Sequence, residues 1–121
     1  MKEIFWKNKN ILITGVHGFV GSNLCKKLID SGARIFGIHK NNSSESILTL
    51  NRIKGYNSIS YNTLTLDKLT ELISDKEIEI CFHLAAQAEV IKGFENPYGT
   101  FDNNFNLTLM LLESIRLSNT V

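Results

Sequence analysis

Short apolar clusters alternate along the chain with stretches in which apolar residues recur every three or four positions. The clusters, each bounded by polar or turn residues, predict buried strands at residues 10–14, 34–38, 57–61 and 78–84. The helical spacing predicts amphipathic helices at residues 19–30, 66–76 and 100–117. Pro97 stands just before the last of these helices, where a proline can help to start one.

The order of these elements predicts the fold class. Strands that alternate with helices favour right-handed crossovers and a parallel sheet covered on both faces, which is a three-layer α/β fold. One long polar stretch, residues 39–57, interrupts the alternation. We expect a loop there, with one or two helical turns between Ile47 and Ile53.

Composition and charge narrow the classes of protein that fit. The chain has 121 residues, 43% of them hydrophobic, which suits one compact domain. A net charge of +1 with scattered basic residues argues against nucleic acid as a partner. Neither a signal-peptide pattern nor an apolar run of about 20 residues occurs, so we expect a cytoplasmic protein without a membrane partner. The three histidines lack zinc-ligand spacing, and no metal site is predicted.

A glycine-rich loop between the first strand and the first helix carries the clearest candidate chemistry. Three glycines follow one another at intervals of three: Gly15, Gly18 and Gly21. They suit a tight turn, the approach of a pyrophosphate to the backbone, and close packing of the helix. The helix N-terminus would offer amide donors and a positive dipole end to the phosphates. The predicted dinucleotide-binding residues of this segment are Gly15, His17, Gly18, Phe19, Val20 and Gly21.

The loop sequence Thr14-Gly-x-x-Gly-Phe-x-Gly21 resembles the signature of extended short-chain dehydrogenases/reductases, the NAD-dependent epimerase/dehydratase family. The segment Phe82-His83-Leu84-Ala85-Ala86-Gln87 is similar to the family segment that lines the ribose and pyrophosphate of the cofactor. This resemblance implies cofactor contacts from Leu84, Ala85, Ala86 and Gln87. It also implies that residues 1–121 form the N-terminal part of a Rossmann-type dinucleotide-binding domain, with four strands in the order 3-2-1-4 and no substrate domain.

Two further stretches resemble individual members of the family. The opening Phe5-Trp6-Lys7-Asn8-Lys9 is similar to the start of CDP-glucose 4,6-dehydratases. The segment Gly37-Ile38-His39-Lys40-Asn41-Asn42-Ser43-Ser44 is similar to GDP-mannose 4,6-dehydratases. The resemblance therefore implies a nucleotide-sugar substrate and hydride transfer at sugar C4. It leaves open which nucleotide sugar is used, and whether the reaction is a dehydration or an epimerisation.

The end of the second strand bears on the choice between NAD and NADP. Family members that select NAD usually carry an acidic residue there, which binds the ribose 2′-hydroxyl. This chain has His39 followed by Lys40, and Lys40 would attract a 2′-phosphate, with Asn41 or Ser43 donating hydrogen bonds. NADP is therefore the expected cofactor and NAD the alternative. The alternative reading of Lys40 is a solvated loop residue.

The family often has Gly-Asp-Leu after the third strand, where the aspartate binds the adenine amino group. The corresponding residues here resemble Asn62-Thr63-Leu64, so Thr63 and Leu64 are assigned to the adenine end. The charge-assisted contact that an aspartate would make is lost.

The family's catalytic Tyr-x-x-x-Lys pair does not occur in this sequence, because the residues four positions after the three tyrosines are Ser60, Thr65 and Asp102. Two hypotheses remain: part of a nucleotide-sugar 4,6-dehydratase or epimerase, or a non-catalytic dinucleotide-binding module or truncated product. His83 lies in a strand expected to be buried on both faces, and it is interpreted as a core histidine with satisfied hydrogen bonds rather than a base, because a base needs access to solvent or substrate. The apolar stripe of the last helix, Phe101, Phe105, Leu109 and Leu112, is interpreted as a packing face. The resemblance implies that part of this stripe could form a homodimer interface, and removal of the rest of the domain would also leave it exposed.

Overall fold

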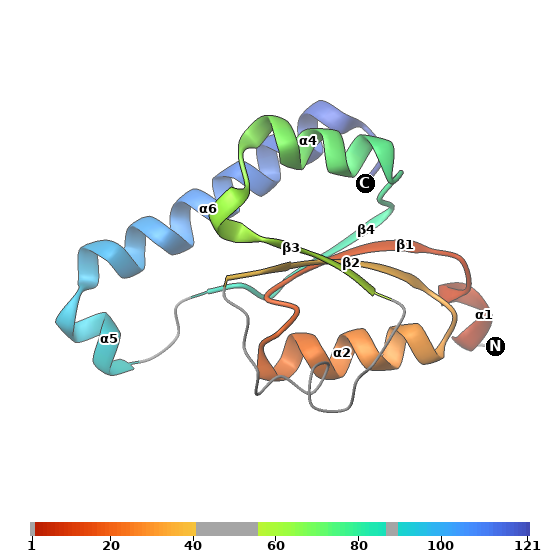
Figure 1. Cartoon of the computed structure of the whole chain (residues 1–121), viewed down its shortest axis with the longest axis horizontal. Helices are drawn as coiled ribbons and strands as arrows, with labels where there is room; N and C mark the ends of the chain where they lie inside the picture. The colour runs from red at the N-terminus through yellow and green to blue at the C-terminus, as the bar shows by residue number, and fades with distance from the viewer. Residues whose placement is uncertain (1, 41–55, 87–89) are drawn as a thin grey trace.

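The fold is a parallel sheet between two layers of helices. The computed structural model describes residues 2–40, 56–86 and 90–121. The elements, in chain order, are α1 (Lys2–Trp6), β1 (Asn10–Thr14), α2 (Phe19–Asp30), β2 (Arg34–His39), β3 (Tyr56–Ser60), the 3₁₀ turn η1 (Tyr61–Thr63), α4 (Leu66–Asp75), β4 (Ile80–His83), α5 (Val90–Glu95) and α6 (Pro97–Ser118). Figure 1 shows α2 on one side of the sheet and α4 with α6 on the other.

The strand order is β3-β2-β1-β4, and every neighbouring pair is parallel. The predicted order is therefore confirmed. Strand β1 is central, with Leu12 paired to Phe36 of β2 and to Cys81 of β4. The chain moves from β1 to β2 and β3 on one side and then crosses to β4 on the other. The strands that follow β1 in the chain are therefore added first on one side of it, as β2 and β3, and then on its other side, as β4. The direction in which the chain winds across the sheet reverses at β1.

Two apolar clusters cover the two faces of β1, as the alternation of side chains along a strand requires. Ile11 and Ile13 pack with Cys25 and Leu28 of α2. Leu12, on the opposite face, packs with residues of α4 and α6, namely Leu69, Ile73 and Leu111. The predicted burial of the first strand on both faces is thus confirmed, and the sheet edge after Thr14 is held from both sides.

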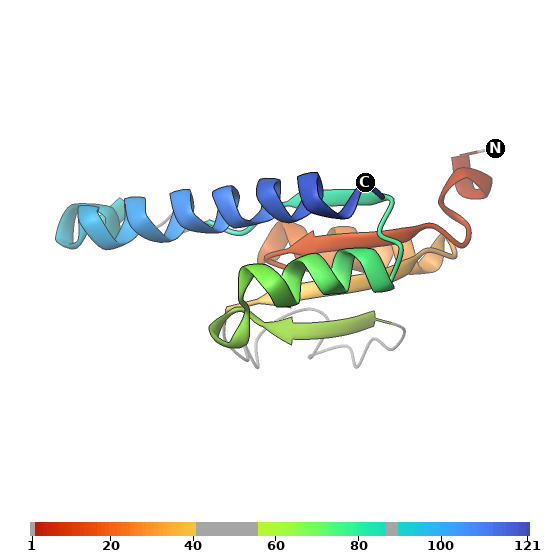
Figure 2. The same cartoon turned by 90° about the horizontal axis from the view of Figure 1, so that it is seen from above.

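Helix α6 begins three residues earlier than the apolar periodicity predicts. Pro97 occupies its first turn, and the side-chain oxygen of Asn96 caps it by accepting from the Gly99 amide at 2.9 Å. Residues 97–100 carry little of the apolar stripe, so periodicity could not detect this turn. Helix α6 then runs beyond the end of the sheet, as Figure 2 shows.

Several other elements differ from the prediction. Helices α1 and α5 were not predicted, because five- and six-residue helices are too short to show a period. Strand β4 is shorter than the predicted 78–84, although Ile78 is buried in the cluster with Leu12. The predicted helical turns between Ile47 and Ile53 lie outside the described residues. Among the helices that the structure describes, none has the length and apolar character needed to span a bilayer.

Candidate functional site

The glycine loop starts where β1 ends and is anchored on the neighbouring strand. The amides of Gly15 and Val16 both donate to the Ile38 carbonyl of β2, at 2.8 and 3.2 Å. Gly15 has a φ of +71°, a backbone conformation that favours glycine. A Cβ at Gly15 would also lie only 3.0 Å from the Ala85 nitrogen. The loop and the segment that follows β4 can therefore lie close together only with glycine at position 15.

The loop leads directly into α2. The Gly18 amide donates to the Gly15 carbonyl at 2.9 Å, and Gly18 is the N-cap residue of α2. Gly21 is buried one turn later, and a Cβ there would collide with the Gly15 carbonyl oxygen. This close contact brings the first turn of α2 against the loop, so that its free amides point out over the sheet edge.

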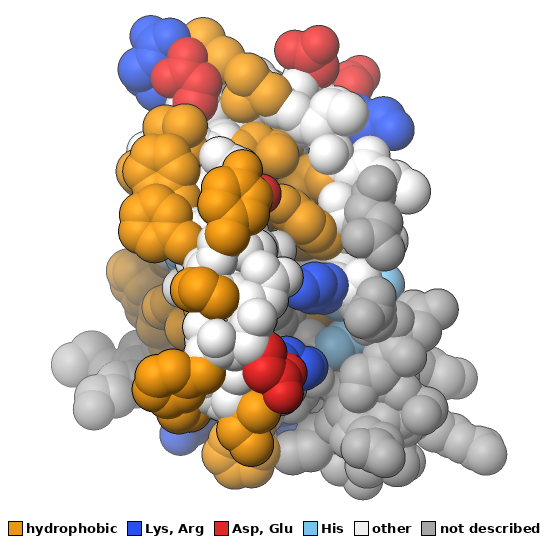
Figure 3. Space-filling model, turned by 90° about the vertical axis from the view of Figure 1, so that its left-hand side faces the viewer, with side chains coloured by type: hydrophobic (Ala, Val, Ile, Leu, Met, Phe, Trp, Pro, Cys, Tyr) orange, Lys and Arg blue, Asp and Glu red, His pale blue; other side chains and the backbone are white. Residues whose placement is uncertain are grey.

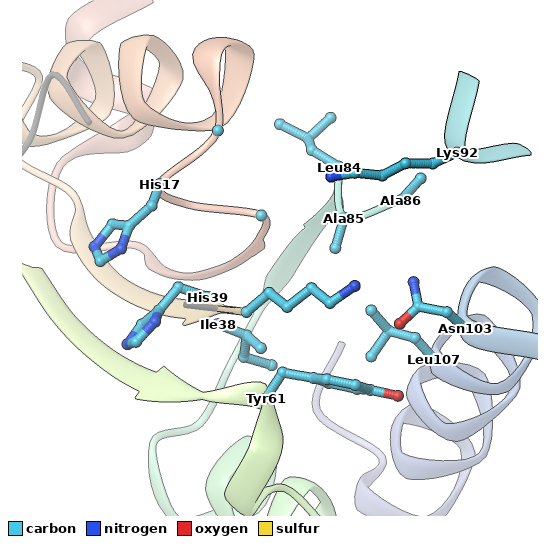
Figure 4. A pocket seen from close by; sticks show the side chains of 13 residues that line it. His17, Ile38, His39, Tyr61, Leu84, Ala85, Ala86, Lys92, Asn103 and Leu107 are labelled. Atoms are coloured by element: carbon cyan, nitrogen blue, oxygen red, sulfur yellow. The ribbon is translucent and has the colours of Figure 1, made fainter. Parts of the chain in front are cut away.

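A cavity of about 380 Å³ opens beside the loop, a volume typical of small-molecule sites. It lies at the carboxyl ends of β1, β2 and β4, where the direction of winding reverses, which is the usual ligand site of an open α/β sheet. Its lining residues are Gly15, His17, Gly18, Ile38, His39, Lys40, Tyr61, Leu84, Ala85, Ala86, Lys92, Asn103 and Leu107. Figure 4 shows His17 and His39 on one side, with Asn103 and Leu107 of α6 across from them.

The described charged residues that line the cavity are all basic. Lys40 and Lys92 line it together with two histidines, and none of the described lining residues is Asp or Glu. A cavity with two lysines in its wall, next to the N-terminus of a helix, favours an anionic ligand. No three His, Cys, Asp or Glu side chains of the described ranges gather in an arrangement that could hold a metal ion.

The two histidines form a stacked pair at the β2 end of the cavity. Their ring centroids are 4.5 Å apart and their planes differ by 20°. The His17 Nε2 atom is hydrogen bonded to the Tyr56 hydroxyl at 3.1 Å, which ties the glycine loop to β3. His39 is the last residue of β2 and is buried, one position beyond the strand end that the sequence predicted.

On the opposite side of the cavity, the side chain of Thr14 holds the segment that follows β4. The amides of Leu84 and Ala85 each donate to the Thr14 Oγ1 atom at 3.1 Å. The same oxygen is 2.7 Å from His83 Nδ1, and His83 Nε2 is 2.9 Å from Thr108 Oγ1. Burial lowers the pKa of His83. Hydrogen bonds at both ring nitrogens agree with the structural interpretation of this histidine. Its expected full burial is wrong, because β4 lies at the sheet edge and all four of its residues remain partly exposed.

The structure describes thirteen of the sixteen predicted site residues and brings eight of them together. Eight of them line the cavity: Gly15, His17, Gly18, His39, Lys40, Leu84, Ala85 and Ala86. Gly21 does not line the cavity, but its lack of a side chain lets α2 pack against the glycine loop. The side chains of Phe19 and Val20 point away into solvent, so only their backbone amides, in the first turn of α2, remain available to a ligand. Asn41, Ser43 and Gln87 lie outside the described residues.

The assignment at the adenine end changes. Thr63 is not among the lining residues, and its hydroxyl donates to the Ser60 carbonyl at 3.0 Å. Leu64 packs into the cluster around Leu12. Tyr61, directly after β3, lines the cavity instead. The rule that ligands bind at the carboxyl ends of parallel strands could have identified Tyr61. Lys92, Asn103 and Leu107 come from helices and carry no local signal.

Comparisons with known proteins agree with this architecture. The model of the NAD dependent epimerase/dehydratase family matches residues 11–121. The chain is 38% identical over 112 residues to Protein CapI of Staphylococcus aureus, covering 88% of this chain and 34% of that protein. It is 31% identical over 116 residues to the CDP-glucose 4,6-dehydratase of Salmonella typhimurium, covering 93% of this chain and 32% of the enzyme.

A solved structure extends this likeness to the fold. The UDP-glucose 4-epimerase of Brucella ovis, in complex with NAD, superposes with a TM-score of 0.78 at 25% identity, covering 93% of this chain and 33% of that one. The chain thus spans about a third of the length of these relatives. With its Rossmann-type strand order and glycine loop, this chain belongs to the NAD dependent epimerase/dehydratase family.

Proposed function

We propose that this chain is the NAD(P)-binding portion of a nucleotide-sugar 4,6-dehydratase or epimerase. The observation that carries the proposal is the cavity beside the glycine loop, which Lys40 and Lys92 line next to the N-cap of α2, with no described acidic residue in the wall. A pyrophosphate carries the complementary charge. Gly18 lines the cavity, and among the described residues a Cβ there would meet only the Gly15 carbonyl oxygen, so the loop leaves room for a phosphate.

Different residues at the cavity would contact different parts of the cofactor. The first amides of α2 would hold the pyrophosphate. The Leu84–Ala86 backbone and Leu107 would bound the opposite wall. When bound, a nicotinamide would supply the hydride chemistry proposed at sugar C4. The sugar chemistry itself is proposed for the whole protein, because this chain spans about a third of the relatives it matches.

NADP is the cofactor we propose, with NAD as the alternative. His39 occupies the end of β2, where a carboxylate would repel a 2′-phosphate, and Lys40 lines the cavity next to it. The UDP-glucose 4-epimerase of Brucella ovis is described in complex with NAD. This supports a nicotinamide dinucleotide as the ligand, but it does not distinguish NADP from NAD.

Titration with NADPH and NADH, followed by nicotinamide fluorescence, tests this proposal. We expect tighter binding of NADPH. Lys40→Ala should weaken NADPH binding about tenfold, the loss of one charge-assisted contact, and leave NADH nearly unchanged. Lys26→Ala is the matched control, because Lys26 pairs with Asp30 on the exposed side of α2. Gly18→Val should abolish the binding of both ligands.

Three outcomes would count against the proposal in different ways. Tighter NADH binding would overturn the preference for NADP. Unchanged binding by Gly18→Val would remove the glycine loop from the site. The second hypothesis, a dinucleotide-binding module that catalyses no reaction, predicts the same cofactor affinity. The reading frame after the Val121 codon distinguishes this hypothesis from the enzyme. A downstream Tyr-x-x-x-Lys supports the enzyme, and a stop codon supports the module.

A further inference from the structure

A chain of side-chain hydrogen bonds links three elements behind the cavity wall. It runs from Thr14 at the end of β1, through His83 at the end of β4, to Thr108 in the middle of α6. The two bonds of the imidazole measure 2.7 Å at Nδ1 and 2.9 Å at Nε2. The chain ends on the Asn104 carbonyl, which accepts from the Thr108 hydroxyl at 2.8 Å.

The partners of Thr14 fix the position of every proton in this chain. A threonine hydroxyl has one hydrogen and can accept two hydrogen bonds. Both acceptor positions of Thr14 Oγ1 are used by the Leu84 and Ala85 amides, at 3.1 Å each. The hydroxyl hydrogen must therefore be donated to His83 Nδ1, which cannot carry a proton of its own.

The assignment at the other end follows from the first. A neutral imidazole with an unprotonated Nδ1 carries its hydrogen on Nε2. His83 Nε2 then donates to Thr108 Oγ1, and the Thr108 hydroxyl is left to donate to the Asn104 carbonyl. All donors point in one direction along the chain. A second proton on Nδ1 would face the Thr14 hydroxyl hydrogen and break the first bond.

We propose that His83 is a positioning residue, a neutral imidazole with its hydrogen on Nε2 that joins β1 to α6 and holds the Leu84–Ala85 backbone against the glycine loop. The Ala85 nitrogen lies 3.0 Å from where a Cβ of Gly15 would be, so a small shift of this backbone changes the loop. Thr108 follows Leu107, another lining residue. The effect on dinucleotide binding rests on the proposed function, and the proton arrangement does not.

The geometry does not suit a general base. Both ring nitrogens already have protein partners, and the accepting nitrogen is turned toward Thr14 rather than the cavity. His83 is also absent from the described residues that line the cavity. The side chain acts through its neighbours and not on a ligand.

Long-range ¹H–¹⁵N spectra of the ¹⁵N-labelled full chain test the proton arrangement directly. At pH 7.5 we expect the His83 ring to show the Nε2–H tautomer, with a hydrogen-bonded hydroxyl proton coupled to Nδ1. A ring with its hydrogen on Nδ1, or a doubly protonated ring, would overturn the proposal. This measurement requires no ligand, so its result is independent of whether the chain binds a dinucleotide.

Amide hydrogen exchange tests the positioning role. Thr108→Val removes the acceptor of His83 Nε2–H and should raise the exchange rate of Ala85 about fivefold, with the β1–β2 amides unchanged. The exchange rate of Leu84 should rise less, because its amide also donates to the Thr14 backbone carbonyl at 3.2 Å. Thr108→Ser keeps the hydroxyl and should restore the slow exchange. Thr70→Val is the matched control, because the Thr70 hydroxyl also donates to the carbonyl four residues earlier in its helix.

The same variants give a second readout with NADPH as the probe. Thr108→Val should bind NADPH about fivefold more weakly than the wild-type chain, and Thr108→Ser within about twofold. Equal exchange at Leu84 and Ala85 in wild type and Thr108→Val would overturn the positioning role. If Thr108→Val does not fold, the wild-type tautomer and the exchange rates in Thr108→Ser still decide the matter. Failure of the wild-type chain to bind NADPH counts against the proposed function alone.

Discussion

The two sides of helix α6 both carry apolar residues and have opposite surroundings. The inner side, formed by Leu107, Leu111 and Ser114, is buried against α4 and the sheet. The outer side, formed by Phe101, Phe105, Leu109 and Leu112, is exposed. Figure 3 shows hydrophobic side chains gathered along this side of the molecule. The interpretation of Phe101, Phe105, Leu109 and Leu112 as a packing face is therefore wrong within the described residues. All four are exposed, and Leu107 and Leu111, on another side of the helix, are buried instead.

The comparison extends to the two halves of the sheet. In the first half, β1 is almost fully buried, and its cluster with α2 supports the glycine loop. In the second half, every residue of β4 is partly exposed, and the exposed apolar residues continue from α6 into α5 as Val90, Ile91 and Phe94. The loop that would bind the phosphates thus rests on the better-packed half. The cavity wall formed by Leu84–Ala86, after β4, depends on fewer packing contacts. The hydrogen bonds that join Thr14, His83 and Thr108 are among the contacts that hold it.

The largest expected effect comes from adjacent leucines on the two sides of α6. Leu111 is 3% exposed and Leu112 is 60% exposed. Leu111→Ala should lower the free energy of unfolding by about 3 kcal/mol, because it opens a space between α6 and α4. Leu112→Ala should change it by less than about 0.5 kcal/mol. Urea unfolding followed by circular dichroism measures both. Equal losses would mean that the outer side is also packed in solution.

A smaller effect is expected on association. We propose that the outer side of α6 pairs with a second copy, since an exposed apolar stripe of this length is unusual on an isolated monomer. Phe101→Glu with Phe105→Glu should convert a concentration-dependent dimer to a monomer in sedimentation velocity. The exposed pair Lys26→Glu and Lys27→Glu on α2 is the control for added negative charge. A wild-type chain that stays monomeric at high concentration would contradict the proposal.

The smallest effect is a pH dependence of stability. Burial lowers the pKa of His83 in the folded chain, so below about pH 6.5 the unfolded chain binds more protons than the folded one. The stability that His83 contributes is present above that pH and is lost as the pH falls toward the lowered folded pKa. Urea midpoints between pH 7.5 and 5.5 should therefore fall more steeply for wild type than for His83→Gln, which cannot titrate. Parallel slopes would exclude His83 as the cause.

The sequence by itself determined where the four strands lie along the chain and where the glycine loop begins. Both depend on local signals: two-sided apolar runs mark strands of a parallel sheet, and the spacing of Gly15, Gly18 and Gly21 requires particular backbone conformations and contacts. The order of the strands in the sheet was expected only from the resemblance of the loop to the family. The end of β2 at His39 and Lys40 was located for the same reason, because the strand boundary and the motif lie in one continuous segment.

Only the tertiary structure decided which residues share the cavity and which apolar surfaces are covered. Tyr61, Lys92 and Leu107 reach the cavity because separate elements converge on one sheet edge, and no local pattern records that convergence. Thr63 does not line the cavity, and its hydroxyl donates to the Ser60 carbonyl in its own turn, so its assignment to the adenine end stays a prediction. The role inferred for His83 depends on hydrogen bonds that span 69 and 25 residues of sequence. Periodicity describes one element at a time, whereas burial and proton position depend on what the other elements place beside it.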